Sequence, residues 1–118
     1  TIGRHRSGVD SDAWAQKYIF PNAMIPSSRQ LTAAAERLFA LNDWHSFGSY
    51  YDRTVMAWHG NFVNNWHDLA GEYDERFYRM WTYYLLMSAG IFRSNKKQLW
   101  QIVFAKRRGA VAGYESIR

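Results

Sequence analysis

Cysteine is absent from this sequence of 118 residues, and proline occurs only twice. Without cysteine the chain can form no disulfide, no thiolate nucleophile and no cysteine-based zinc site, and a reducing compartment is permitted rather than required. Long apolar runs are also absent, and none reaches the roughly 18 residues that a membrane-spanning helix needs. The sequence has no glycine-rich phosphate loop that opens a helix and no nucleophile-elbow motif. A membrane span, a phosphate loop and a serine hydrolase site therefore have no support in the sequence.

Charge and histidine spacing narrow the possible partners. The net charge is +5, from 15 Lys and Arg against 10 Asp and Glu, which favours anionic partners such as acidic lipid head groups, nucleic acid or a phosphate-bearing cofactor. The basic residues cluster only weakly near the two ends of the chain and form no stripe along a helix, so we expect no nucleic acid partner. The histidines match no standard zinc spacing, and we expect no metal site. They are His5, His45, His59 and His67.

Aromatic residues are abundant: the chain has six Trp, eight Tyr and seven Phe, which make up 18% of its residues. The length suits one domain that can bury a core. Core filling is the simplest use of so many rings. A load this high also indicates a cavity or groove that holds something long and apolar.

The first third of the chain predicts loops and one helix. Residues 1–13 are polar and indicate a loop. Residues 14–27 are more apolar, but Pro21 and Pro26 prevent a continuous helix there, so we expect an ordered, aromatic-lined loop. Ser27, followed three residues later by Gln30, matches a capping box and predicts the start of a helix of about three turns.

Two long amphipathic helices are predicted next. Ser49 and Asp52 have capping-box spacing, and Gly71 ends the apolar stripe that follows them. Asp74 can cap the second of these helices. The first stripe consists of Val55, Trp58, Phe62, Trp66 and Leu69. The second consists of Phe77, Met80, Trp81, Tyr84, Ser88 and Ile91.

The segment "QLWQIVFAK" near the C-terminus predicts a strand with two apolar faces, which is typical of a strand inside a covered sheet. One or two strands cannot bury both faces of a sheet. We therefore expect the partners of this strand to be missing from the chain, and residues 99–105 to pair with a second copy or to be exposed.

Several aromatic residues lie where neither a helix nor a strand explains them. Phe20 lies in an apolar loop, and apolar loop residues indicate the wall of a pocket, because loops are normally solvated. Tyr50 and Tyr51 lie at the entrance of a predicted helix, where free backbone N–H groups favour an anion. A Tyr hydroxyl at this place can donate a hydrogen bond to that anion. These signals alone predict a helical domain that forms a pocket.

Four motifs occur in this order along the chain: "KYIFPNAMIPSSRQL", "DWHSFGSYYDRTVMAWHGNF", "RFYRMWTYYLLMSAGIFR" and "QLWQIVFAKR". With these motifs, residues 1 to about 107 resemble the C-terminal part of the cyclopropane fatty-acyl-phospholipid synthases. Mycolic-acid cyclopropane synthases are more distant relatives. The resemblance implies an α/β fold: the C-terminal part of a class I, Rossmann-like methyltransferase, mostly helical here, with about two strands. Residues 1–26 would line the substrate pocket, 27–48 form a helix and a strand, 49–94 form a two-helix lipid-pocket insertion, and 95–118 form the last, antiparallel strand and the tail.

The resemblance also implies a reaction and site residues. The family transfers a methyl group from S-adenosylmethionine to a cis double bond of a phospholipid acyl chain, and bicarbonate takes a proton from the resulting carbocation. Aromatic walls suit this chemistry, because ring faces stabilise a nearby cation. Tyr51 matches the tyrosine that binds the bicarbonate, and Ile2 matches a residue whose backbone N–H does so. Phe20 and Tyr84 match aromatic positions along the acyl-chain tunnel.

Other parts of the family pattern are not in this sequence. The cofactor loop and the remaining bicarbonate ligands would lie upstream of Thr1, so we expect a missing N-terminal methyltransferase part, no cofactor-binding residues in this segment, and no activity from the segment alone. Asn42 and His59 depart from residues common in relatives. As a whole enzyme it would be cytoplasmic, peripheral to the inner membrane and able to form a homodimer. The open alternatives are a non-catalytic helical module that binds lipid or a partner, and a related methyltransferase acting on another lipid.

Overall fold

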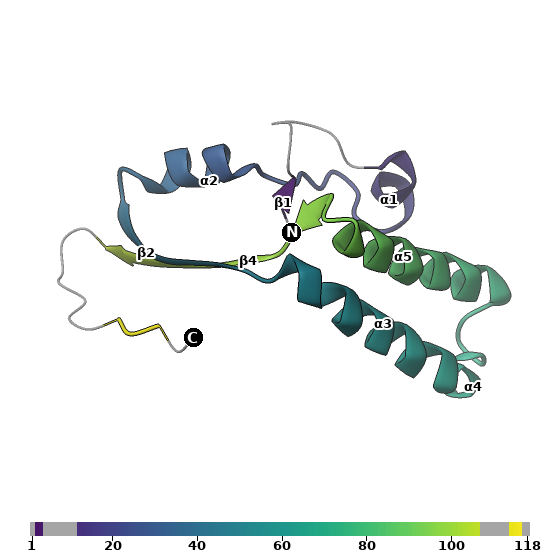
Figure 1. Cartoon of the computed structure of the whole chain (residues 1–118). Coiled ribbons are helices and arrows are strands. Elements are labelled where there is room, and N and C mark those ends of the chain that lie inside the picture. Colours follow the sequence, from purple (N-terminus) through teal and green to yellow (C-terminus); the bar gives the residue numbers. More distant parts are fainter. Residues whose placement is uncertain (1, 4–11, 107–113, 117–118) are drawn as a thin grey trace. The chain divides into compact units, whose positions relative to one another are not determined.

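The computed structural model describes residues 2–3, 12–106 and 114–116 (Figure 1). The chain divides into two compact units, which are described separately. The strand unit comprises residues 1–47 and 98–118, and the helical unit comprises residues 48–97.

The centre of the strand unit is an antiparallel pair of strands, β2 (Phe39–Ser46) and β4 (Trp100–Lys106). Phe39 lies opposite Lys106 and Ser46 opposite Trp100, with an irregularity between Leu41 and Asp43 that leaves Asn42 out of the register. A second, shorter pair consists of β1 (Ile2–Gly3) and β3 (Lys97–Gln98). The strand predicted near the C-terminus is therefore present as β4. The expectation that its partners are missing from the chain was wrong for one neighbour, because β2 pairs with β4.

Aromatic contacts reinforce the β2–β4 pair. The Trp44 and Trp100 rings meet edge to face with centroids 4.5 Å apart, and the Phe39 and Phe104 rings are 5.9 Å apart. Cross-strand aromatic pairs of this kind stabilise antiparallel strands. Trp100 and Phe104 of the predicted strand thus join it to its neighbour.

A short helix, α1 (Ala13–Tyr18), occupies part of the region where only a loop was expected. The Asp12 carboxylate caps it by accepting hydrogen bonds from the backbone N–H groups of Trp14 and Ala15, at 2.8 and 3.2 Å. The expectation was wrong because Pro21 prevents a helix only near its own position, and α1 ends before it. The loop prediction holds for the rest of this segment up to Ser27.

The second helix, α2 (Ser28–Ala35), begins with the predicted capping box. The Ser27 hydroxyl accepts a hydrogen bond from the Gln30 backbone N–H at 3.3 Å, and the Gln30 side chain accepts one from the Ser27 N–H at 2.8 Å. Two backbone donors that a helix start leaves free are satisfied in this way.

The helical unit is an antiparallel hairpin in which α3 (Gly48–Asn64) and α5 (Glu75–Arg93) run side by side, with the short α4 (Trp66–Leu69) between them (Figure 1). The first long helix was predicted to continue unbroken to Gly71, but it ends at Asn64. The backbone N–H of Asn65 and its side-chain amide both donate to the Asn61 carbonyl, at 3.1 and 2.7 Å, and Asn65 itself leaves the helical conformation, with φ -105° and ψ 14°. Ser49 lies inside α3, so it is not the predicted N-cap.

Both ends of α5 are fixed by local hydrogen bonds. At its start, Asp74 accepts from the Phe77 N–H at 2.8 Å, as predicted. At its end, the Asn95 N–H donates to the Phe92 carbonyl and the Lys96 N–H to the Ile91 carbonyl, at 3.0 and 3.1 Å. This is a Schellman ending, in which Asn95 adopts the left-handed conformation with φ 56° that asparagine tolerates better than most residues.

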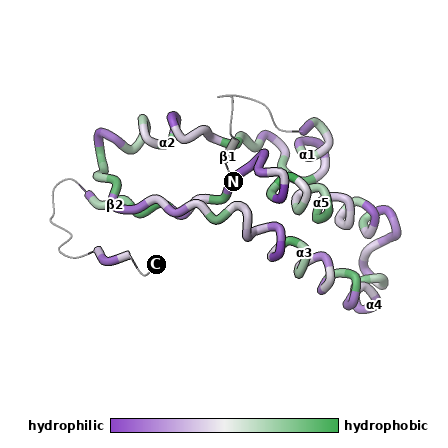
Figure 2. The backbone as a smooth tube through the Cα atoms, viewed as in Figure 1, coloured by the Kyte–Doolittle hydropathy of each residue, from purple (hydrophilic) through white to green (hydrophobic). Residues whose placement is uncertain are grey.

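The core of the hairpin lies one residue away from the stripe predicted for α5. Val55 of α3 and a stripe of α5 are buried to 2–5% exposure, while the predicted stripe is only half-buried. The buried α5 residues are Leu85, Ala89 and Phe92. Their spacing matches one helix face as well as the predicted stripe does. Figure 2 shows apolar residues recurring among polar ones along both long helices.

A cluster of rings closes the other end of the hairpin. Phe62 stacks on Tyr78 with centroids 5.4 Å apart, and Trp66 lies 4.9 Å from the same Tyr78 ring. The hairpin is therefore held at its far end by aromatic packing.

Candidate active site

Tyr51 lies in the first turn of α3, where two aromatic rings hold its own ring. The Tyr51 ring meets Phe92 edge to face with centroids 5.0 Å apart and Trp58 with centroids 5.7 Å apart. Phe92 is only 5% exposed, whereas Tyr51 is half-buried. No hydrogen bond joins the Tyr51 hydroxyl to another described residue. The ring is thus anchored while the hydroxyl can still donate, beside a helix start whose N–H groups favour an anion.

Tyr84 of α5 belongs to the same helical unit, and its phenol interacts electrostatically with Tyr51. Burial raises the pKa of the Tyr84 phenol above its usual value of 10.0; a hydrogen bond with Ser88 lowers this pKa, and the neighbouring Tyr51 raises it. Tyr84 therefore keeps its proton at neutral pH and remains a hydrogen-bond donor. The structure brings together these two of the predicted site residues.

The other two predicted site residues, Ile2 and Phe20, lie in the strand unit. Ile2 is in β1, and Phe20 is in the loop after α1, where its side chain is 53% exposed. The roles predicted for both residues, a backbone contact to bicarbonate and a place in the acyl-chain tunnel, stay predictions.

Three residues around Tyr51 were not singled out from the sequence: Phe92, Asp52 as an ion-pair partner, and Arg93. Arg93 Nε lies 3.0 Å from Asp52 Oδ2. Phe92 could have been found from its spacing with Leu85 and Ala89. The ion pair could not have been found from the sequence, because it depends on how the two helices align. In addition, the spacing of Ser49 and Asp52 favours a capping box.

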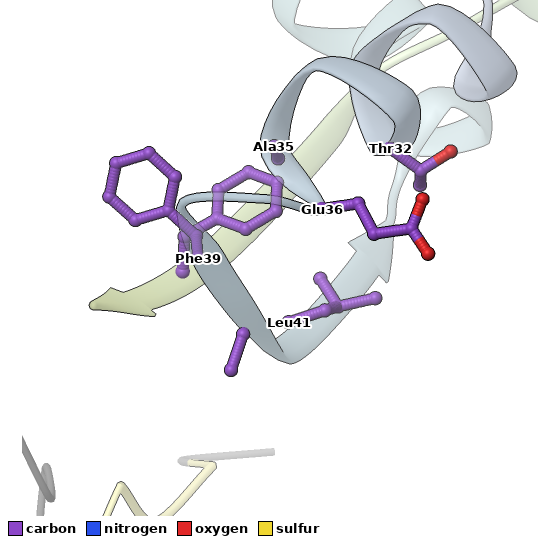
Figure 3. Close-up of a pocket in the computed structure, with 7 residues that line it drawn as sticks. Thr32, Ala35, Glu36, Phe39 and Leu41 are labelled. Carbon is purple, nitrogen blue, oxygen red and sulfur yellow. The ribbon is translucent and has the colours of Figure 1, made fainter. Parts of the chain in front are cut away.

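A pocket of about 360 Å³ lies within the strand unit, between α2, β2 and β4. Figure 3 shows the Glu36 carboxylate and Thr32 on one side of it and the Phe39 ring on the other. The Thr32 hydroxyl already donates a hydrogen bond to the Ser28 carbonyl at 2.9 Å. Glu36 is the charged residue among those that line the pocket, and its charge is negative. A pocket with that charge does not suit an anion, and none of the predicted site residues lines it.

The described part of the chain has neither a cluster of metal ligands nor a helix that could span a membrane. Among residues 2–3, 12–106 and 114–116, no group of three or more His, Asp or Glu side chains could hold a metal ion. No helix in these ranges combines the length and apolar character needed to cross a membrane.

Within the helical unit, His59 Nε2 and Thr82 Oγ1 are buried without a hydrogen-bond partner among the described residues.

Known proteins resemble this chain closely. It is 48% identical over 106 residues to the cyclopropane-fatty-acyl-phospholipid synthase of Escherichia coli K12, an alignment that covers 90% of this chain and 28% of that enzyme. It is 43% identical over 88 residues to a Citrobacter freundii protein of the same name, covering 75% of this chain and 97% of that sequence. The chain thus spans under a third of the length of the Escherichia coli relative.

The fold comparison agrees with the predicted fold class. The cyclopropane synthase MmaA2 from Mycobacterium tuberculosis matches with a TM-score of 0.74 and 23% identity, over 79% of this chain and 33% of that one. The α/β methyltransferase fold predicted from the motifs is thereby confirmed. Residues 2–102 match the family described as mycolic acid cyclopropane synthetase. The chain belongs to the mycolic acid cyclopropane synthetase family, and the resemblance to cyclopropane synthases predicted from its motifs is confirmed.

Proposed function

We propose that this chain is the C-terminal, lipid-binding part of an S-adenosylmethionine-dependent methyltransferase that forms cyclopropane rings on phospholipid acyl chains. The observation that carries the proposal is the 48% identity to the Escherichia coli synthase along 90% of this chain. The reaction, the phospholipid substrate and the catalytic roles belong to the whole protein.

The helical unit offers surface for an acyl chain. Its α5 has two adjacent apolar stripes, of which only one is buried in the hairpin. The other stays half-buried, and further apolar side chains of the hairpin are exposed, for example Trp58 at 48% and Leu86 at 44%. Exposed apolar patches of this kind mark interaction sites. An acyl chain and the upstream part of the enzyme are the occupants that we propose.

Tyr51 is the residue that we propose to hold bicarbonate. Its phenol is a donor at the start of a 17-residue helix, and its ring is fixed against Phe92, so the residue present fits a small anion. Ile2 would contribute its backbone N–H. S-adenosylmethionine would bind mostly to residues upstream of this segment. When bound, it would supply the methyl group. The rings around Tyr51 would exclude water and tolerate positive charge near their faces.

A chimera tests the proposed function. The chimera replaces the matched segment of the Escherichia coli synthase with this chain and is expressed in Escherichia coli cells that lack their own synthase. We expect mass spectrometry of the fatty acids to show acyl chains that gain one methylene group. A synthase truncated at the same junction is the control and should form no such product.

Other outcomes of this experiment would change the proposal. A folded, abundant chimera without product would contradict it, and vesicle binding in that case would favour the non-catalytic lipid-binding module. A saturated, methyl-branched product would favour a related methyltransferase. Tight S-adenosylmethionine binding by this chain alone, measured by calorimetry, would contradict the placing of the cofactor site upstream.

Location and assembly are part of the same proposal. The net charge of +5 would help a cytoplasmic enzyme to reach the anionic inner membrane, where its phospholipid substrate lies. The unpaired edges of β2 and β4 within the described sheet would favour pairing with a second copy or with the upstream part.

A further inference from the structure

The ion pair between Asp52 and Arg93 joins the two long helices directly beside Tyr51. Arg93 Nε donates to Asp52 Oδ2 at 3.0 Å across 41 positions of sequence. The Asp52 side chain is only 16% exposed, whereas that of Arg93 is 66% exposed. The carboxylate is thus largely buried, and the ion pair is a tertiary contact between α3 and α5.

Two neighbouring contacts fix how α3 is turned about its axis. Tyr51 packs on Phe92, and the next residue of each helix forms the ion pair. Successive residues of a helix point about 100° apart, so the two contacts hold α3 at separate points around its circumference. Buried Val55 and the Phe62–Tyr78 stack hold α3 against α5 further along the hairpin, and the ion pair adds a contact directly beside Tyr51. The direction of the Tyr51 side chain therefore depends in part on Asp52.

The α5 side of this arrangement is itself well fixed. The Schellman ending uses the carbonyls of Ile91 and Phe92, so the last turn of α5 is held by its own hydrogen bonds. Arg93 also lies in the last turn of α5, where a positive charge is favourable. Phe92 and Arg93 are thus a stable support for Tyr51 rather than a fraying helix end.

We infer that Asp52, through its ion pair with Arg93, is a positioning residue that holds the Tyr51 hydroxyl in place to bind bicarbonate. This inference rests on the function proposed above. Because the Arg93 side of the pair is 66% exposed and Asp52→Asn leaves no unpaired buried charge, loss of the pair should cost little stability, whereas a displacement of about 1 Å at a reacting group can cost roughly a hundredfold in rate. Loss of the pair should therefore affect bicarbonate binding and turnover far more than folding.

The experiment uses variants of the chimera. Asp52→Asn and Arg93→Gln should each weaken bicarbonate binding, measured by calorimetric titration, and slow turnover by roughly tenfold to a hundredfold, with the KM for S-adenosylmethionine unchanged. The double variant should be no worse than either single one, because both break the same pair. Asp52→Glu should keep most of the binding. Glu72→Gln removes an exposed charge of the same helical unit and should change neither bicarbonate binding nor turnover.

The outcomes separate the inference from the proposed function. If Tyr51→Phe weakens bicarbonate binding while Asp52→Asn lowers only the thermal unfolding midpoint, the positioning role is overturned and the function stands. If Tyr51→Phe leaves bicarbonate binding unchanged, Tyr51 is not a bicarbonate ligand and the inference fails with it. If the parent chimera forms no product, the proposed function itself fails.

Discussion

The Tyr51 ring meets the Phe92 ring edge to face, with centroids 5.0 Å apart and planes inclined at 76°. This contact is made by the ring of Tyr51 and does not involve its hydroxyl group. Packing and chemistry at this residue can therefore be separated by substitution, because phenylalanine keeps the ring and removes only the oxygen.

Tyr51→Phe in the chimera should slow turnover by roughly tenfold to 150-fold, the loss expected for one hydrogen bond to a charged group, about 1.5–3 kcal/mol. The thermal unfolding midpoint and the KM for S-adenosylmethionine should stay unchanged, because the ring contacts remain. Steady-state kinetics and calorimetry measure these quantities. Tyr50→Phe is the matched control, since Tyr50 is 64% exposed. Equal rates for the Tyr51 variant and the parent would remove Tyr51 from the site.

Phe92→Ala should destabilise the helical unit by about 3–5 kcal/mol, as expected when a buried aromatic side chain leaves a cavity. The reason is its 5% exposure among Val55, Leu85 and Ala89 in the core of the hairpin. The measurement is the thermal unfolding midpoint of the chimera. Leu86→Ala, on the same helix but 44% exposed, should lower the midpoint far less. Similar shifts for both variants would show that the hairpin core is placed wrongly.

The raised pKa of Tyr84 predicts a dependence of stability on pH. Burial keeps the proton on the folded phenol above pH 10.0, while the unfolded phenol ionises near its ordinary value. The contribution is therefore complete below that pH and is lost as pH rises through the folded pKa. The thermal midpoint of the chimera should fall more steeply above pH 10.0 than that of Tyr84→Phe. Identical slopes would contradict the burial of this phenol.

Local patterns predicted the starts of α2 and α5. The hydrogen bonds of Ser27 with Gln30 and of Asp74 with Phe77 close within a few residues, so spacing alone carries the information. The same holds for the strand at 100–106, whose alternation is visible in the sequence. The short α1 was not predicted, because Pro21 and Pro26 were expected to prevent a helix throughout residues 14–27, whereas α1 ends at Tyr18, before Pro21.

Tertiary choices could not be predicted in the same way. The apolar residues of α5 form two adjacent stripes, and only the packing of α3 decides that Leu85 and Ala89 are buried while Tyr84 is half-buried. The pairing of Asp52 with Arg93 follows from the same alignment. Tyr51 and Tyr84 were found by resemblance to a family, because no spacing rule connects residues of two different helices.

The free strand edges predict self-association of this chain on its own. Within the described sheet β4 has only β2 beside it, and Phe104 is 37% exposed on its surface. Exposed edges and apolar faces favour pairing with another copy, so light scattering of the isolated chain should show species larger than a monomer. Phe104→Lys should reduce them, whereas Asn64→Lys, which adds the same charge on α3, should not. A strictly monomeric profile would refute this prediction.

Binding of the chimera to lipid vesicles should depend on charge. The chain carries a net charge of +5, and attraction to an anionic surface is screened within a Debye length, about 10 Å at 0.1 M salt and about 3 Å at 1 M. Cosedimentation with anionic vesicles should therefore weaken as salt rises and should be weaker for neutral vesicles at low salt. Replacing the exposed Arg76 and Arg79 by glutamine tests whether α5 contributes to this attraction. Binding that is indifferent to salt would instead mean that the exposed apolar residues of the hairpin, rather than its charges, make the contact with lipid.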